Sequence, residues 1–132
     1  MKVLLDTNAY TYFKGGDAAI FAELAQSQTI YLPVVVIGEL YVGFRNGSKL
    51  KENKEQLERF LEQSMVETIN ITLDTALIFS EIRHYLQKKG KPISINDVWI
   101  AASVIETGSL LITYDKDFLH IPGLRVWDML KN

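Results

Sequence analysis

The sequence contains no cysteine and only two histidines among its 132 residues. Disulfide bonds, zinc–thiolate sites and thiol nucleophiles are therefore excluded, although the absence of cysteine leaves the redox compartment open. His84 and His120 do not stand at the spacing of a metal-binding pair, so we expect packing or surface roles for both. Any chemistry must therefore use oxygen and nitrogen ligands.

Long hydrophobic runs and an excess of one charge are also missing. No stretch reaches the roughly 18 apolar residues of a membrane span, and Asp6 interrupts the first apolar run too early for a signal peptide. We therefore predict a cytoplasmic protein with no membrane association. The 14 basic and 16 acidic residues give a net charge of −2, so a nucleic-acid partner would have to be held by local patches.

The length and composition are those of one domain. With 48% hydrophobic residues, the chain can form one sizeable core, and no repeat or linker divides it. We predict a single domain over residues 1–132.

Short apolar segments alternate with helical patterns along the chain. The expected strands span residues 2–6, 29–32, 66–73, 110–113 and 124–127. One expected helix has Pro33 in its first turn and continues over residues 34–44. A second is capped by Asp74 and runs to about Lys89, and a third is capped by Ser94 and closed by Gly108. Apolar strands alternating with helices predict an α/β fold, with a mainly parallel sheet of about five strands between two helical layers.

Acidic residues follow two of the expected strands. Asp6 ends Val3-Leu4-Leu5, and Asp115 follows Leu110 to Tyr114. In parallel sheets ligands bind beyond the carboxyl ends of the strands, so packing would bring these two acids to the same edge.

Two further acids lie in helical patterns. Asp97 stands three residues after Ser94, where a capping role is an equally good explanation. The segments around Asp6 and Asp115 can also be plain turns or caps. Glu39 is different, because it is the only charge between Tyr31 and Phe44 and has no basic partner at helical spacing. Several carboxylates without histidine or cysteine form a hard site that suits Mg²⁺ or Mn²⁺, ions that bind phosphates.

Four motifs in order carry a resemblance that spans essentially the whole chain. They are Leu5-Asp6-Thr7-Asn8, Gly38-Glu39-Leu40 with Gly43, Asn96-Asp97-Val98-Trp99, and Thr113-Tyr114-Asp115-Lys116-Asp117-Phe118. Together they resemble the PIN-domain family and, within it, the VapC-like toxin ribonucleases. The usual asparagine before the fourth acid is Tyr114 here, which puts the hydrogen bonding around Asp115 in question.

This resemblance implies a function and a set of site residues. Asp6, Glu39, Asp97 and Asp115 carry over as catalytic and metal-binding acids, with supporting positions at Asn8, Thr113 and Asp117. It further implies a PIN-like fold, Mg²⁺- or Mn²⁺-dependent endoribonuclease activity on RNA, a homodimer and inhibition by a cognate VapB-like antitoxin.

Other groups have weaker claims on function. A basic segment could contact RNA phosphates, or could simply complement the dipole of a helix end; it comprises Arg83, Lys88, Lys89 and Lys91. Core packing is the simplest role for Tyr10, Tyr12 and Phe13, with a dimer or antitoxin contact as the alternative.

Two other classes of protein remain open on the sequence alone. A receiver-like, magnesium-binding signalling domain also places carboxylates at strand ends, and Asp74 would be its mid-chain phosphoacceptor. It would leave Glu39 unexplained. A non-catalytic RNA-binding or interaction module could retain the same scaffold, although the complete acidic set disfavours it.

Overall fold

Four parallel strands form the centre of the molecule in a computed structural model that describes residues 1–131. The strands are β1 (Lys2–Leu5), β2 (Thr29–Pro33), β3 (Val66–Ile69) and β4 (Leu110–Ile112), in the spatial order β3-β2-β1-β4. Strand β1 is central, and Val3 pairs with Ile30 on one side and with Leu110 on the other. The predicted α/β class with a parallel sheet is confirmed.

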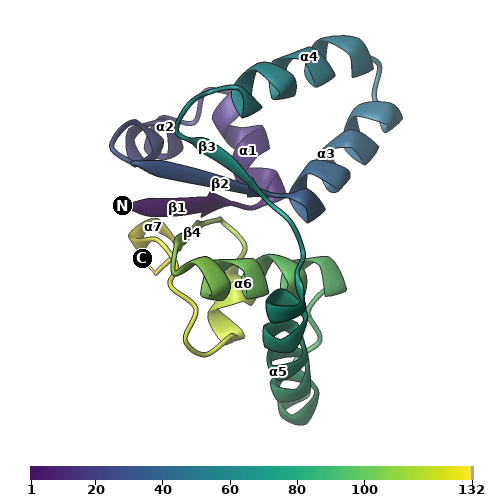
Figure 1. Ribbon diagram of the computed structural model, residues 1–132, viewed down its shortest axis with the longest axis vertical. Helices are drawn as coiled ribbons and strands as arrows, with labels where there is room; N and C mark the ends of the chain where they lie inside the picture. Colours follow the sequence, from purple (N-terminus) through teal and green to yellow (C-terminus); the bar gives the residue numbers. More distant parts are fainter. Residues whose placement is uncertain (132) are drawn as a thin grey trace.

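Helices cover both faces of this sheet. They are α1 (Thr7–Lys14), α2 (Ala18–Ala25), α3 (Val34–Asn46), α4 (Leu50–Leu61), α5 (Leu73–Lys89), α6 (Ile95–Thr107), the 3-10 helix η1 (Lys116–His120) and α7 (Asp128–Lys131). Figure 1 shows α1, α3 and α4 on one side of the strands and α5 and α6 on the other. Val3, Leu4 and Leu5 are therefore fully buried, which explains why β1 is apolar after the exposed Lys2.

The structure corrects the expected number of strands, which is four and not about five within residues 1–131. The segment 124–127 makes one isolated bridge, between Val126 and Leu111. Leu111 donates a backbone hydrogen bond to Arg125 and accepts one from Trp127, and the turn before this segment has Gly123 at φ 78°.

Three expected boundaries are also wrong. The third strand ends at Ile69 rather than at residue 73, and α5 is capped by Thr72 rather than Asp74, because Thr72 and Thr75 form a reciprocal capping box. Pro33 closes β2 and caps α3 instead of lying in its first turn.

Other expectations hold. Ser94 caps α6, and Gly108 ends it in the left-handed conformation with φ 66°. No helix within residues 1–131 is long and apolar enough to cross a membrane.

Candidate metal centre

Asp6 lies where β1 ends and α1 begins. Its Oδ1 accepts a hydrogen bond of 2.8 Å from the backbone N–H of Ala9, so the residue caps α1. Its Oδ2 accepts a hydrogen bond from the hydroxyl of Thr113, beyond the end of β4. Only 5% of Asp6 is exposed. The capping role considered for this acid is real, and it coexists with a buried position at the carboxyl edge of the sheet.

Thr113 also organises the loop that carries Asp115. Its hydroxyl accepts a hydrogen bond of 3.0 Å from the backbone N–H of Asp115. Its carbonyl accepts one of 2.6 Å from the indole N–H of Trp127. The Oδ1 of Asp115 accepts a hydrogen bond of 2.9 Å from the backbone N–H of Asp117, so Asp115 caps η1. Thr113 and Asp117 thus contact the acids that they were expected to support.

The hydrogen-bond partners of Glu39 lie in distant parts of the chain. The hydroxyl of Thr7, at the start of α1, donates to its Oε1. The side-chain amide of Asn96, in the first turn of α6, donates to its Oε2 over 3.2 Å. Sequence reasoning missed both roles, although each donor is the direct neighbour of a motif acid. These bonds explain how an acid in the middle of α3 is accommodated.

One cavity of about 210 Å³ brings the four acids together. It is lined by Asp6, Thr7, Asn8, Glu39, Ser94, Asp97 and Asp115. The acids come from the end of β1, from α3, from the first turn of α6 and from the loop after β4. The predicted Asn8 lines the same cavity, whereas Ser94 had been expected only as a cap.

The charges of these acids interact. Burial raises the pKa of Asp6 from 3.8 to about 6, against the hydrogen bonds from Thr113 and Ala9, and the nearby Asp97 and Asp115 raise it further. Burial likewise raises the pKa of Asp97, the Ser94 hydroxyl lowers it, and Asp115, Glu39 and Asp117 add to the rise. No cationic side chain of the described residues is among the groups that shift either pKa.

The donor set fits a hard divalent cation. All the available ligands are oxygens, and a cation would offset the burial and the mutual repulsion that raise the pKa of Asp6 and Asp97. In residues 1–131, no three acidic or histidine side chains are already arranged to hold an ion.

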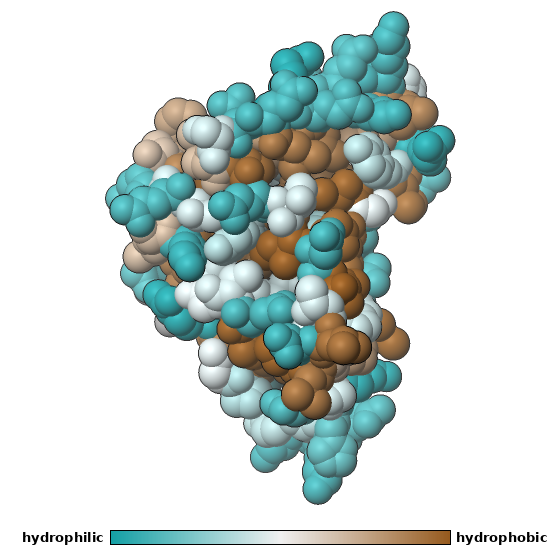
Figure 2. Space-filling model, viewed as in Figure 1, coloured by the Kyte–Doolittle hydropathy of each residue, from teal (hydrophilic) through white to brown (hydrophobic). Residues whose placement is uncertain are grey.

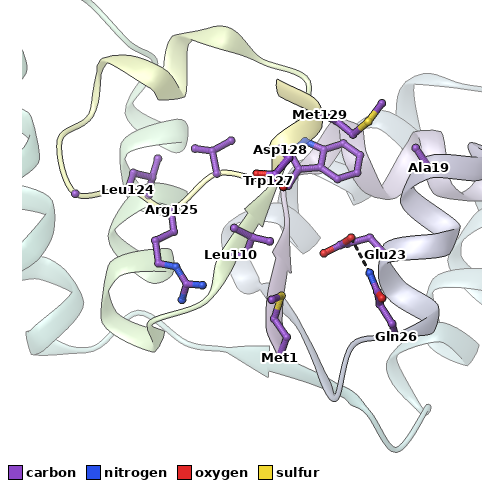
Figure 3. A pocket seen from close by; sticks show the side chains of 12 residues that line it. Met1, Ala19, Glu23, Gln26, Leu110, Leu124, Arg125, Trp127, Asp128 and Met129 are labelled. Atoms are coloured by element: carbon purple, nitrogen blue, oxygen red, sulfur yellow. Dashed lines mark hydrogen bonds between the residues drawn. The ribbon is translucent and has the colours of Figure 1, made fainter. Parts of the chain in front are cut away.

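A larger cavity lies at the opposite edge of the sheet. It measures about 890 Å³ and is lined by Met1 and Leu110, near the starts of β1 and β4, and by residues of α2 and of segment 123–129. Figure 3 shows Glu23 and Gln26 hydrogen-bonded to each other there, with Arg125 and Trp127 on the facing segment. None of the predicted acids lines it, so size does not identify the functional site.

The basic segment, which lies on α5 and just beyond its end, is outside the acidic cavity. None of its residues lines that cavity, and the Nζ of Lys89 stands 5.8 Å from the ring centroid of Tyr85 on the same helix. Lys88 and Lys89 belong to the last turn of α5, where positive charge complements the helix dipole. Their contact with RNA stays a prediction.

The fold is a central parallel sheet, and the site is an acidic cavity at the carboxyl edge of that sheet. Both agree with the family that the sequence matches. The family model described as "PIN domain" matches residues 3–124, and the chain belongs to that family.

Particular relatives match over nearly the full length. The chain is 33% identical to "Ribonuclease VapC2" of Rickettsia felis, covering 97% of this chain and 99% of the relative. It is 25% identical to the "tRNA(fMet)-specific endonuclease VapC" of Salmonella typhimurium, covering 97% and 98%. Among solved structures, VapBC2 from Rickettsia felis bound to a promoter DNA fragment gives a TM-score of 0.85 at 30% identity, covering 97% of this chain and 100% of that chain. VapBC-1 from nontypeable Haemophilus influenzae gives 0.86 at 26% identity, covering 97% and 98%.

Proposed function

We propose that this chain is a Mg²⁺- or Mn²⁺-dependent endoribonuclease and acts as the toxin of a toxin–antitoxin pair. The observation that carries the proposal is the shared cavity of Asp6, Glu39, Asp97 and Asp115 at the carboxyl edge of the sheet. Support comes from the names of its relatives, which are VapC ribonucleases. An RNA-cleaving toxin of this kind would act in the cytoplasm, where its substrate is found.

The reaction is hydrolysis of a phosphodiester bond. A water oxygen bonds to phosphorus, the bond from phosphorus to the leaving ribose oxygen breaks, and a proton ends on that leaving oxygen. A divalent cation in the cavity would supply Lewis acidity toward the phosphate and the water. Asp6 and Glu39 would give fixed ligands, because protein donors already hold both oxygens of each carboxylate. Asp97 and Asp115 would complete the set.

The test is cleavage of total RNA by the purified protein with Mg²⁺ and with chelator. We expect cleavage only with Mg²⁺, and a loss of at least about 100-fold in Asp97→Asn, since a charged ligand is removed. Glu67→Gln is a matched control, because Glu67 is an exposed acid on β3. Equal rates for Asp97→Asn and the parent would overturn the assignment. Calorimetry that detects RNA binding but no cation binding would favour the non-catalytic module instead.

The receiver-like alternative does not agree with the structure. Its phosphoacceptor would have to end a central strand, but β3 is an edge strand that ends at Ile69, and Asp74 is exposed in the first turn of α5. The family match also assigns the chain elsewhere.

The partner proposal rests on a second surface. An apolar groove of about 520 Å³ runs between α1, α2, α4 and the start of β3, with Phe13, Phe21 and Phe60 among its walls and Lys14 and Arg59 beside them. Burial and the charge of Arg59 lower the pKa of Lys14. An antitoxin segment with apolar side chains and a carboxylate would fill this groove and offset both cations. Co-expression with a cognate VapB-like antitoxin should suppress cleavage, and Phe21→Asp should relieve that suppression.

A homodimer is the remaining part of the proposal. Large apolar side chains are exposed on two helices, with Val42 of α3 at 59%, Leu77 of α5 at 62% and Leu73 at 90%. Figure 2 shows hydrophobic surface along the right side of the molecule, the side on which α3 lies in Figure 1. A second copy that covers such surface would explain its exposure. Sedimentation should give a dimer for the parent and a monomer for Leu77→Asp.

A further inference from the structure

Two exposed tyrosines lie next to each other, each close in sequence to a residue that lines the acidic cavity. Tyr12 of α1 is 50% exposed and Tyr114, in the loop after β4, is 37% exposed. Their ring centroids are 5.4 Å apart with an angle of 78° between the planes. In this edge-to-face arrangement, the ring that presents its edge keeps both of its faces out of the contact. Tyr12 is therefore not the core residue that the sequence favoured, in contrast to Tyr10, which is 3% exposed.

The pair is held in place although it is exposed. The hydroxyl of Tyr114 donates a hydrogen bond of 2.8 Å to Oδ2 of Asp17. The other oxygen of Asp17 accepts one of 2.9 Å from the backbone N–H of Ile20, so this carboxylate joins Tyr114 to the start of α2. The ring of Tyr114 also packs edge-to-face against the buried Trp127, with centroids 5.4 Å apart. An aromatic surface that is already ordered loses little entropy when a ligand stacks on it.

Both tyrosines are connected directly to residues of the acidic cavity. Tyr114 immediately precedes Asp115, which lines the cavity. Tyr12 lies four residues after Asn8, another lining residue, and therefore one turn further along the same face of α1. A nucleotide whose phosphate reached the cavity would place a neighbouring base within reach of these rings.

We propose that Tyr12 and Tyr114 form a stacking platform for one unpaired base of the RNA substrate, adjacent to the phosphate that is cut. The inference rests on the proposed ribonuclease function and deepens it, because it assigns substrate positioning to two residues outside the acidic set. Unpaired RNA bases bind to proteins by stacking on aromatic rings, a contact open to every base. The platform would favour single-stranded RNA and would fix which phosphate enters the cavity.

The test is RNA binding without divalent cation, so that no cleavage occurs. A short single-stranded RNA is compared with versions of it that carry one abasic nucleotide at successive positions. We expect the parent to lose about 5- to 150-fold in affinity at one position, the range of a single stacked base. Tyr12→Ala should bind the intact RNA more weakly than the parent does, by the same factor. Removing the base at that position should not lower the affinity of Tyr12→Ala any further. Tyr12→Phe, which keeps the ring, should behave as the parent, as should Tyr85→Ala, which removes a partly exposed tyrosine on α5.

Several results would overturn the platform. One is an intact-RNA affinity of Tyr12→Ala equal to that of the parent; another is an abasic scan in which both proteins lose affinity equally at every position. Unchanged RNA binding together with weakened antitoxin binding would assign the pair to a protein contact instead. Cleavage by the parent with Mg²⁺ is measured separately, so that the two proposals can be told apart. If the parent cleaves RNA but the effects of Tyr12→Ala and of removing one base are independent, only the platform is wrong. Absence of cleavage defeats the ribonuclease proposal itself.

Discussion

Thr113 donates its hydroxyl hydrogen to Asp6, a residue 107 positions earlier in the chain. The same hydroxyl accepts the backbone N–H of Asp115. One oxygen atom therefore fixes two of the four acids relative to each other, across the junction between β1 and β4. This contact makes Thr113 a positioning residue whose effect can be measured apart from that of the acids.

Thr113→Val should loosen the site while keeping the shape of the side chain. The buried Oδ2 of Asp6 would lose its donor, and the backbone N–H of Asp115 would lose its acceptor. We expect about 1–3 kcal/mol less stability in urea unfolding, the usual cost of unpaired buried polar groups. Calorimetry should show Mg²⁺ binding about 10- to 100-fold more weakly, as is typical when a partner of a metal ligand is lost.

Thr113→Ser is the matched control, because it keeps the hydroxyl and removes one methyl group. Mg²⁺ affinity in Thr113→Ser should stay close to that of the parent. If valine and serine weakened Mg²⁺ binding equally, side-chain volume rather than the hydrogen bonds would be responsible.

Asp6 should make the metal-free protein less stable as the pH rises. Burial raises the pKa of Asp6 from 3.8 to about 6 in the folded state. The folded protein therefore holds this proton more tightly than the unfolded chain does. The resulting stabilisation is complete below about pH 4 and is lost as the pH passes 6, and a difference of roughly two pH units corresponds to about 3 kcal/mol.

Urea unfolding in chelator between pH 4 and pH 8 measures this loss as the difference between the parent and Asp6→Asn. The free energy of unfolding of the parent should fall relative to that of the variant as the pH rises. Saturating Mg²⁺ should restore the stability of the parent but not that of the variant. Parallel curves for the two proteins would show that the carboxylate of Asp6 is not under this strain.

Local sequence patterns predicted much of the fold and part of the site. The apolar stretch of β1 and the caps at Ser94 and Gly108 are properties of neighbouring residues, so they could be predicted. The meeting of Asp6 with Asp115 followed from the rule that parallel strands end at one edge. The cap of α5 could not be chosen locally, since Thr72 and Asp74 are both competent. Thr72 prevails through its reciprocal bonds with Thr75 and a hydrogen bond to Glu106 of α6.

The partners of Glu39 show the limit of such reasoning. Thr7 lies 32 positions before it and Asn96 lies 57 positions after it. No helical spacing relates these residues, because their contact depends on how α1 and α6 dock against α3. A lone acid in an apolar helix signalled that donors had to exist, but not which residues they were.

Glu39→Gln should separate charge from shape at this position. The amide keeps the length of the side chain, and its oxygen can still accept the hydroxyl of Thr7. We expect the free energy of unfolding to stay within about 1 kcal/mol of the parent, because one partner only is disturbed. Mg²⁺ affinity in calorimetry should fall at least about 10-fold, since a charged ligand is lost. Unchanged Mg²⁺ affinity would remove Glu39 from the metal-binding set.

The basic segment can be resolved residue by residue through salt dependence. Lys91 lies three residues before Ser94, which lines the acidic cavity, so its backbone is at most about 11 Å from that residue. Lys88 lies in the last turn of α5, further from the cavity along the chain. A phosphate contact to single-stranded RNA contributes about 0.7 to the slope of log affinity against log salt concentration. We expect Lys91→Ala to reduce that slope by about this amount and Lys88→Ala to reduce it by less. Equal slopes for the parent and Lys91→Ala would remove Lys91 from the substrate path.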